Sequence, residues 1–242
     1  MTPENTPLLI LAGGLATRLR DLAKSTPKYL QPIDGATCFA DLHLRWVSRQ
    51  GFNRVFICVG HLGEQIESYC GRGEKYGLEI EYLFDGDRQV GTGGAVLGAL
   101  KFPFTGLAVT YGDTLLSLPV AGFLNGFSKS GMAAAMSVYR NKVSGHFCNS
   151  SLEGSCTIYD KFSPKTEWKF IDYGFLAFRR ETLEAFSETI PFDLALPLTR
   201  LSQAHQLFGY EATERFFEIG SPEALAELRR VFVNDSIGHY DT

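Results

Sequence analysis

Leu8-Leu-Ile-Leu-Ala-Gly-Gly14 sets five apolar residues directly before a pair of glycines. A short apolar run bounded by a turn is typical of a buried strand, and a strand buried on both faces belongs to a parallel sheet. In open α/β sheets, ligands bind beyond the carboxyl ends of such strands. The stretch therefore predicts the first strand of an α/β sheet, followed by a turn that can face a ligand.

The next hundred residues repeat this pattern of short apolar runs separated by longer amphipathic stretches, which is typical of parallel strands joined by helical crossovers. Gly51 is expected to end one of the helices. The right-handed crossover rule then places helices on both faces of the sheet. We expect strands at 8–12, 55–59, 78–84 and 107–111, and helices at 38–50, 62–70 and 94–100.

After residue 130 the pattern changes to strands separated by loops, at 132–139, 156–159 and 170–178. These predict a small antiparallel insertion in a mixed, mostly parallel sheet. Helices are expected again at 180–186, 193–204 and 222–231. The 242 residues fit one Rossmann-like domain with two halves, 1–112 and 113–232, and a tail at 233–242.

Composition narrows the classes of protein that remain. The formal charge is −4, and no Lys or Arg cluster exceeds two adjacent residues, which argues against nucleic-acid and anionic-membrane partners. No signal peptide or membrane-spanning run is found in the sequence. The five cysteines form no C-x-x-C pair, and their odd number favours reduced thiols in a cytoplasmic protein.

The turn after the first strand carries groups that suit a polyphosphate. Gly13 and Gly14 let backbone N–H groups approach an anion, and Thr17 adds a hydroxyl donor. Arg18 can donate two parallel hydrogen bonds to phosphate oxygens, and Lys28 adds a point charge. The loop matches neither G-x-x-x-x-G-K-[ST] nor G-x-G-x-x-G, and by itself it is also compatible with an ordinary strand-to-helix turn.

The whole string from Leu11 to Arg20, followed by Pro27-Lys28, resembles the sugar nucleotidyltransferase signature L-A-G-G-x-G-T-R-L with its later P-K. It departs at Ala16, where the family generally has glycine. The resemblance implies the nucleotide-diphospho-sugar transferase fold, with a nucleotide-binding first half and a sugar-phosphate-binding second half. It implies nucleotide-binding roles for Leu11, Ala12, Gly13, Gly14 and Thr17, and catalytic roles for Arg18 and Lys28.

Further segments resemble the family in the same order. Val90-Gly-Thr-Gly-Gly-Ala95, alone readable as a turn, resembles the segment that contacts base and sugar. Gly112-Asp113 resembles the G-D motif that holds Mg²⁺, and Phe216 to Glu223 resembles D-[IV]-G-[TS]-P-E, with Glu218 in place of Asp. The roles implied are nucleotide binding for Thr92, Gly93 and Gly94, metal binding for Asp113 and Glu218, and catalysis for Asp113.

A third group of residues would bind the sugar phosphate. Tyr159-Asp-Lys161 and Phe170-Ile-Asp-Tyr-Gly174 resemble the family's strands that contact the acceptor. They imply sugar-phosphate binding by Lys161, Asp172 and Gly174, with Lys161 also catalytic, and the resemblance implies the same binding role for Gly112 of the G-D motif. Lys165 and Lys169 compete for the cation role, and Glu218 alone could be an exposed charge or a partner of Arg215.

The resemblance implies a cytoplasmic, Mg²⁺-dependent enzyme that joins a nucleoside triphosphate to a sugar 1-phosphate for surface polysaccharide or cell-wall synthesis. Among family members it looks most like heptose 1-phosphate guanylyltransferases and N-acetylmuramate 1-phosphate uridylyltransferases. Two other classes stay open: a catalytically silent nucleotide-sugar sensor, favoured by Ala16 and Glu218, and a dinucleotide-binding oxidoreductase domain. The sugar, the base and the oligomeric state, with a homodimer as one alternative, are not determined.

Overall fold

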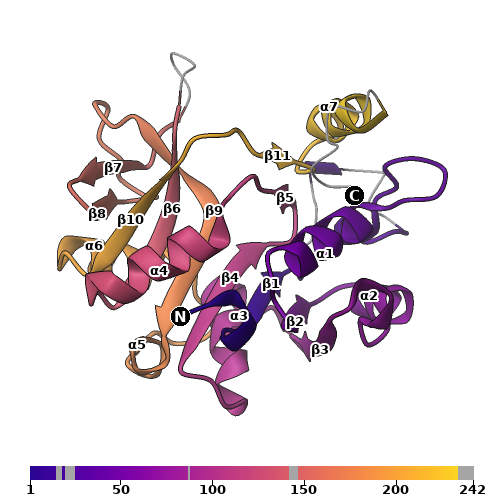
Figure 1. Ribbon diagram of the computed structural model, residues 1–242, viewed down its shortest axis with the longest axis horizontal. Helices are drawn as coiled ribbons and strands as arrows, with labels where there is room; N and C mark the ends of the chain where they lie inside the picture. The colour runs from indigo at the N-terminus through magenta and orange to yellow at the C-terminus, as the bar shows by residue number, and fades with distance from the viewer. Residues whose placement is uncertain (15–17, 20–24, 87, 142–146, 234–242) are drawn as a thin grey trace.

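The computed structural model describes residues 1–14, 18–19, 25–86, 88–141 and 147–233 (Figure 1). Within them, nine strands form one sheet in the order β3-β2-β1-β4-β9-β6-β10-β8-β7. Its strands are β1 Leu8–Leu11, β2 Arg54–Val59, β3 Glu79–Phe84, β4 Gly106–Tyr111, β6 Ala134–Arg140, β7 Ser150–Glu153, β8 Cys156–Tyr159, β9 Phe170–Arg179 and β10 Leu207–Ala212.

The sheet is parallel in its first part and mixed in its second. Strand β1 pairs in parallel with β2 and β4, and β2 pairs in parallel with β3. Strand β9 is antiparallel to both β4 and β6, while β10 is parallel to β6 and antiparallel to β8. A separate two-stranded antiparallel sheet joins β5 Thr114–Leu115 to β11 Phe217–Glu218. The expected mixed α/β fold is confirmed, and the expected strands at 132–139, 156–159 and 170–178 are β6, β8 and β9 of the main sheet. The β5–β11 pair was not expected.

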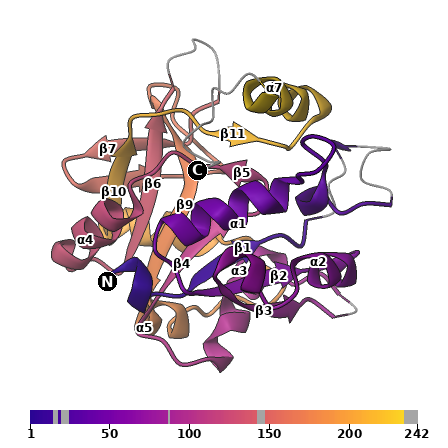
Figure 2. The ribbon, with the colours of Figure 1, turned by 45° about the vertical axis from the view of Figure 1, so that its right-hand side comes forward.

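Helices cover both faces of the sheet (Figures 1 and 2). Residues of α1 Phe39–Arg49, α2 Gly63–Cys70, α4 Val120–Ser130 and α7 Pro222–Val233 belong to one buried apolar cluster. Residues of α3 Gly91–Leu97, α5 Arg180–Glu184 and α6 Ala195–Gln203 belong to the other. Short 3₁₀ turns lie at η1 Pro3–Asn5, η3 Lys28–Leu30, η4 Glu74–Tyr76 and η5 Gly98–Lys101.

Strand β1 lies between these two clusters, which explains its unbroken run of apolar residues. Leu8 and Ile10 pack into one cluster and Leu9 into the other, and all three are fully buried. Full burial of each aliphatic side chain stabilises the fold by about 2 kcal/mol. These alternating contacts place β1 in the middle of the sheet, where its carboxyl end lies between those of β2 and β4.

Helix α4 was not expected, because two glycines interrupt its pattern. A Cβ on Gly126 would lie 2.8 Å from the Phe208 ring, and one on Gly122 would lie 3.1 Å from the Tyr210 hydroxyl. Both aromatic residues belong to β10, another element absent from the expectation. Glycine lowers the helix propensity of α4, but its lack of a side chain lets the helix approach β10 closely.

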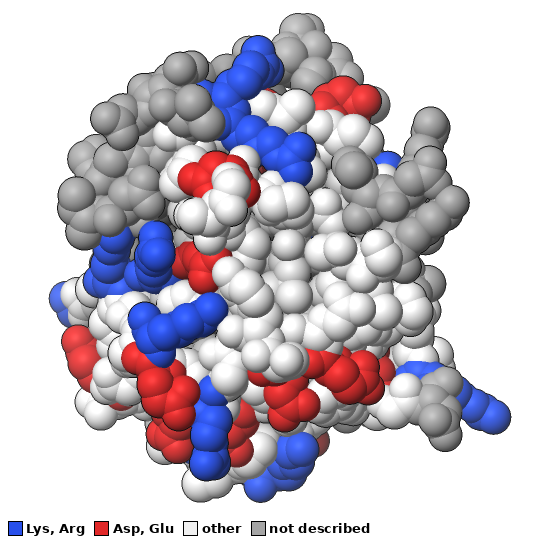
Figure 3. All heavy atoms as spheres, turned by 90° about the vertical axis from the view of Figure 1, so that its right-hand side faces the viewer, with Lys and Arg blue, Asp and Glu red and all other residues white. Residues whose placement is uncertain are grey.

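Other expectations need smaller corrections. Strand β7 was not expected, and α3 begins at Gly91 rather than at residue 94. The division into two functional halves stays a prediction, and residues 234–242 of the expected tail lie outside the described residues. No described helix is long and apolar enough to cross a membrane. On the face drawn in Figure 3, acidic and basic side chains are interspersed among the residues shown in colour.

Candidate active site

A cavity of about 320 Å³ lies beyond the carboxyl ends of the four parallel strands β3, β2, β1 and β4. The strand order runs outward in both directions from β1, and this reversal point is where open α/β sheets bind ligands. The cavity is lined by Leu11, Ala12, Gly13, Gly14, Lys28, Tyr29, Cys58, Asp85, Gln89, Gly91, Thr92, Ala95, Tyr111, Gly112 and Asp113.

Glycine is required at the cavity floor because the strand ends converge there. A Cβ on Gly112 would lie 2.9 Å from the Leu11 carbonyl oxygen, which accepts a hydrogen bond from the Gly112 N–H at 2.9 Å. A Cβ on Gly13 would lie 3.3 Å from the Gly60 nitrogen. Around Gly14, by contrast, a Cβ would meet no atom within 4 Å. Backbone at Gly14 is therefore open to a ligand, while Gly13 and Gly112 are held by packing.

One end of the cavity carries an ion pair. Lys28, in η3, contacts Asp113, which follows β4, through Nζ and Oδ2. The other carboxylate oxygen of Asp113 accepts a hydrogen bond from the Thr114 hydroxyl at 3.1 Å. The two side chains are only 15% and 30% exposed, so their charges are partly shielded from water. A cation and a carboxylate separated by 85 residues thus meet at the strand ends, and the roles that the sequence predicted for the two residues stay predictions.

Arg18 and Glu218 approach the same end from opposite ends of the chain. In the β5–β11 pair, Glu218 lies opposite Thr114, and the Ile219 N–H donates to the Asp113 carbonyl at 2.9 Å. The Arg18 guanidinium and the Glu218 carboxylate both lie beside Gly220. A Cβ on Gly220 would be 3.2 Å from the guanidinium and 3.4 Å from a carboxylate oxygen of Glu218. Thr17 and Ala16, expected beside Arg18, lie outside the described residues.

These carboxylates suit a hard divalent cation. Mg²⁺ takes oxygen ligands and is usually bound by one or two carboxylates, with water and substrate phosphates completing the octahedron. Asp113 directly precedes β5, and Glu218 lies opposite the next residue, Thr114, so the two carboxylates can supply such a pair. Within the described residues, no group of three or more His, Cys, Asp or Glu could hold a metal. The fit therefore depends on substrate oxygens, and the metal roles stay a prediction.

A second cluster of polar side chains adjoins the cavity through Tyr111. The Tyr111 hydroxyl donates to Asp172 at 3.2 Å, and the Gly174 N–H donates to the other oxygen of Asp172 at 2.9 Å. Burial raises the pKa of Asp172 to about 6. The sequence predicted Asp172 and Gly174 together on β9, but it did not predict Tyr111.

Lys161, which follows β8, forms an ion pair with Asp193 at 2.5 Å. Asp193 also accepts a hydrogen bond from the Thr92 hydroxyl at 3.4 Å, and Thr92 lines the cavity. Lys161 and Thr92 were expected to bind different substrates. Asp193, which the sequence did not single out, connects them.

Gly93 and Gly94 face away from the cavity, although the sequence grouped them with Thr92. A Cβ on Gly93 would lie 2.0 Å from the Phe192 ring, and the Gly93 N–H donates to the Phe192 carbonyl at 3.0 Å. A Cβ on Gly94 would lie 2.9 Å from the Val90 side chain. In this structure both glycines serve packing, and their nucleotide-binding role stays a prediction.

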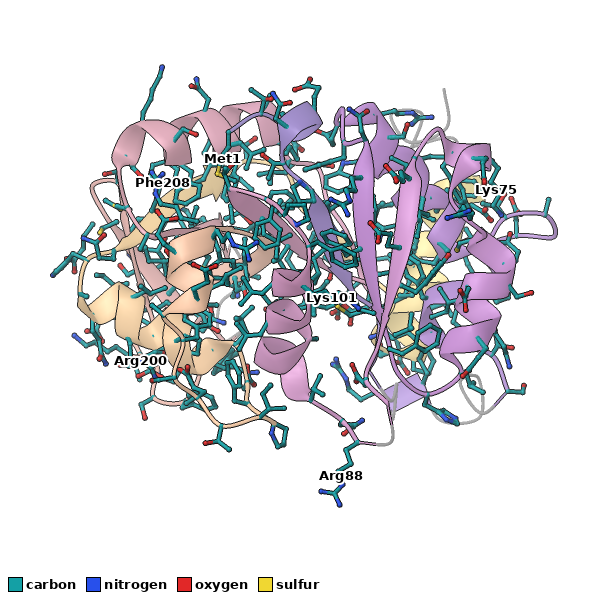
Figure 4. The ribbon with its side chains drawn as sticks, turned by 90° about the horizontal axis from the view of Figure 1, so that it is seen from below. Met1, Lys75, Arg88, Lys101, Arg200 and Phe208 are labelled. Atoms are coloured by element: carbon teal, nitrogen blue, oxygen red, sulfur yellow. The ribbon has the colours of Figure 1, made fainter. Side chains whose placement is uncertain are left out.

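Asp85 and Gln89 also line the cavity, and no sequence motif indicated them. Burial raises the pKa of Asp85 above its ordinary value. The position of Asp85 in the sequence could have indicated it. Asp85 directly follows the strand β3, just as Asp113 follows β4 after one glycine. On the same loop, Arg88 is exposed, and its side chain points away from the body of the protein (Figure 4).

The fold and the cavity together define a Rossmann-like α/β protein with its ligand site at the reversal of strand order. Residues 8–146 match the family described as "Nucleotidyl transferase". This match covers more than half of the 242 residues, so the chain belongs to that family and the expected resemblance is confirmed. The family's substrates are a nucleoside triphosphate and a sugar 1-phosphate, and its enzymes generally use a divalent metal.

Two curated relatives are named as sugar 1-phosphate nucleotidyltransferases. D-glycero-alpha-D-manno-heptose 1-phosphate guanylyltransferase of Campylobacter jejuni is 33% identical over 47% of this chain and 50% of its own length. N-acetylmuramate alpha-1-phosphate uridylyltransferase of Neisseria meningitidis serogroup B is 34% identical over 46% of this chain and 48% of its own. The matched part of the chain thus spans about half the length of these relatives.

Two solved structures extend the likeness to nearly the whole fold. HddC from Yersinia pseudotuberculosis has a TM-score of 0.77 at 19% identity, covering 94% of this chain and 99% of its own. A putative glucose-1-phosphate thymidylyltransferase from Bacillus anthracis has a TM-score of 0.78 at 16% identity, covering 93% and 94%. At these identities the likeness supports the fold of residues after 146 as well, which the family match leaves uncovered.

Proposed function

We propose that this protein transfers a nucleoside monophosphate from a nucleoside triphosphate to a sugar 1-phosphate and releases pyrophosphate. The observation that carries the proposal is a cavity with one lysine in its lining and a second lysine connected to that lining by hydrogen bonds. Lys28 lies at one end beside Asp113. Lys161 reaches the cavity through Asp193 and Thr92. Two anionic reactants need two separate cationic binding positions, whereas a protein that binds one finished product does not.

In this reaction a phosphate oxygen of the sugar 1-phosphate attacks the α-phosphorus in line. A new P–O bond forms while the bond between the α-phosphorus and the bridging oxygen breaks, and pyrophosphate leaves with that electron pair. The nucleophile needs no strong base, because the second pKa of a phosphate monoester is about 6. The protein's task is to position the two anions and to neutralise their charge.

Each charged residue then has a distinct task. Arg18 and Lys28 bind the triphosphate, and Lys161 holds the acceptor phosphate. Mg²⁺ bound by Asp113 and Glu218 would supply the remaining positive charge. In the described residues Lys28 contacts Asp113, so Lys28 is available to phosphate once a cation takes the carboxylate.

Within the cavity, Asp85 favours guanine as the base. The Asp85 carboxylate lies beside the turn after β1, 3.4 Å from where a Cβ on Gly13 would be, while Lys28 lies beside Asp113 after β4. A nucleotide with its phosphates near Lys28 therefore extends its base toward Asp85. An ionised carboxylate only accepts hydrogen bonds. Guanine offers two adjacent donors, N1–H and the N2 amino group, whereas uracil offers one N–H between two carbonyl oxygens.

The base assignment is tested by Asp85→Asn. We expect the ratio of kcat/KM for GTP to that for UTP to fall about tenfold, because one bidentate contact discriminates by about 1–3 kcal/mol. Steady-state kinetics with both nucleotides measure it. An unchanged ratio in a well-folded variant would remove Asp85 from base selection.

The function itself is tested by a matrix of the four ribonucleoside triphosphates and dTTP against several sugar 1-phosphates, with pyrophosphate release as the readout. We expect turnover that EDTA abolishes and Mg²⁺ restores. Glu81→Gln, which removes the Arg54–Glu81 ion pair of β2 and β3, serves as a control for loss of one charge elsewhere. Absence of pyrophosphate from every pair would favour the silent sensor instead. The five free cysteines suit the cytoplasm as the proposed location.

A further inference from the structure

The segment that carries Asp193 is bound to the first turn of α3. The Phe192 N–H donates to the Val90 carbonyl at 3.3 Å, and the Leu194 N–H donates to the Thr92 hydroxyl oxygen at 2.9 Å. A Cβ on Gly91 would lie 2.3 Å from the Phe192 carbonyl oxygen. Glycine in the G-T-G-G stretch thus lets residues 192–194 lie directly against the helix start, and this fixes the backbone of Asp193.

The Asp193 carboxylate joins three elements. One oxygen accepts from the Lys161 ammonium at 2.5 Å, and the other accepts from the Thr92 hydroxyl at 3.4 Å and from the Ala195 N–H at 2.9 Å. Burial acts to raise the pKa of Asp193, but the Lys161 ammonium and the Ala195 N–H outweigh it and hold that pKa below its ordinary value. The carboxylate is therefore ionised at neutral pH.

We propose that Asp193 is a positioning residue: it orients Lys161 toward the acceptor phosphate and links the position of Lys161 to Thr92 in the nucleotide cavity. The inference rests on the proposed function and deepens it. It also gives the G-T-G-G stretch a second role, because its glycines allow residues 192–194 to pack against α3, and this segment carries the carboxylate that orients Lys161.

Lys161 needs such a partner. Its side chain is 47% exposed, and a lysine has a long, flexible stem with a point charge at its end. The ammonium has three donors, so the bond to Asp193 leaves two for a phosphate. Asp193 can thus keep its contact with Lys161 while the acceptor phosphate binds. Asp193 then orients Lys161 and does not compete with the phosphate for it.

Thr92 provides the link to the nucleotide. Its hydroxyl accepts a hydrogen bond from the Leu194 N–H and donates one to Asp193, while its residue lines the cavity. A nucleotide that packs against Thr92 would fix this hydroxyl and, through it, the carboxylate. We therefore expect the acceptor to bind more tightly after the nucleoside triphosphate than before it.

The first test is Asp193→Asn, which keeps the shape but removes the charge, with Asp193→Glu as a conservative rescue. We expect Asp193→Asn to raise KM for the sugar 1-phosphate about tenfold, because a partly exposed charge-assisted hydrogen bond is lost. KM for the nucleoside triphosphate and kcat should stay within about twofold, and Asp193→Glu should recover part of the loss. A fall in KM for the sugar 1-phosphate would overturn positioning in favour of competition.

The second test is a double-mutant cycle with Thr92→Val. If both side chains act through Lys161, the double variant should raise KM for the sugar 1-phosphate no more than Asp193→Asn alone. Additive effects would overturn the link through Thr92. Glu81→Gln is the matched control, and thermal unfolding of every variant identifies those that fail to fold.

A binding measurement keeps this inference separate from the proposed function. Calorimetric titration with inorganic phosphate needs no turnover, and the same titration of Lys161→Ala separates binding at Lys161 from binding at Arg18 and Lys28. We expect Asp193→Asn to bind phosphate about tenfold more weakly than the wild type, with Asp193→Glu in between. Equal affinity in the wild type and in Asp193→Asn would overturn the inference, even where the matrix assay shows pyrophosphate release.

Discussion

The two ends of the candidate site are built differently. At the proposed nucleotide end, the cavity floor is backbone at the ends of β1 and β4, where glycines such as Gly13 and Gly112 allow close approach. At the proposed acceptor end, the walls are charged and polar side chains from separate elements: Lys161 contacts Asp193, and Asp172 accepts a hydrogen bond from Tyr111. The nucleotide end therefore depends on chain conformation, and the acceptor end depends on charge.

This difference predicts how each end responds to substitution. A change at the backbone-lined end should alter either packing or the few charges placed there, and those charges should matter for the chemical step. A change at the acceptor end should mainly alter binding of one substrate. The four predictions below test this division, from the largest expected effect to the smallest.

Asp113→Asn should have the largest effect, because it removes both the partner of Lys28 and one proposed metal ligand. We expect kcat to fall about a thousandfold, at the upper end of what loss of one transition-state contact costs. Added Mg²⁺ should not restore it. Pyrophosphate release over a range of Mg²⁺ concentrations measures this, and near-normal turnover would show that Asp113 is not a ligand.

Arg18→Ala should follow, with a loss of about 3 kcal/mol of transition-state stabilisation and therefore about a hundredfold in kcat. Arg18 is exposed, so the melting temperature should change little. Kinetics and thermal unfolding on the same sample separate the two effects. A variant that keeps wild-type turnover would contradict the proposed grip of Arg18 on the triphosphate.

Gly93→Ala tests the packing role of the backbone-lined end. The added methyl group would lie 2.0 Å from the Phe192 ring, so we expect destabilisation of about 1–3 kcal/mol. Gly98→Ala is the matched control, since its Cβ would meet only a Leu83 methyl at 3.9 Å. Chemical denaturation compares them. Equal stability of the two variants would show that Phe192 adjusts freely.

The smallest effect concerns Asp172, whose pKa burial raises from 3.8 to about 6. The folded protein then binds this proton more tightly than the unfolded chain. The resulting stability is fully present below pH 3.8 and is lost as the pH rises through about 6. Relative to Asp172→Asn, the wild type should lose unfolding free energy between pH 4 and 7.

Carboxyl NMR of the wild type gives the pKa of Asp172 directly. Kinetics cannot replace it, because the acceptor phosphate itself titrates at about 6. A midpoint near 4, or a pH dependence of stability shared by wild type and Asp172→Asn, would show that Asp172 is hydrated rather than buried.

The sequence predicted the parallel half of the sheet well, because its strands are buried on both faces and appear as short apolar runs, as in β1 and β2. It missed α4, whose glycines are explained only by the aromatic side chains of β10. It missed β10 itself, because Leu207–Ala212 is half-buried and mixes polar with apolar residues. Packing between elements decides these segments, and local pattern does not reveal it.

For the site, the sequence predicted residues that belong to recognisable motifs, and the structure brings Lys28 and Asp113 together. Their roles, like those of the other site residues, stay predictions until they are tested. Asp193 was not found because its side-chain partners are 32 and 101 residues away in the chain. Tertiary contacts at such separations leave no mark on local sequence pattern, so only the folded chain reveals them.

The β5–β11 ribbon has a consequence for biosynthesis. All the residues that line the cavity precede β5, but Glu218 is incorporated more than a hundred residues later than Tyr111. At translation rates of about 5–20 residues per second, this interval lasts roughly 5–20 s. During it the nascent chain would hold a nucleotide pocket without its second carboxylate. Catalysis would thus wait for the last part of the domain, so that a prematurely terminated chain could bind nucleotide but not consume it.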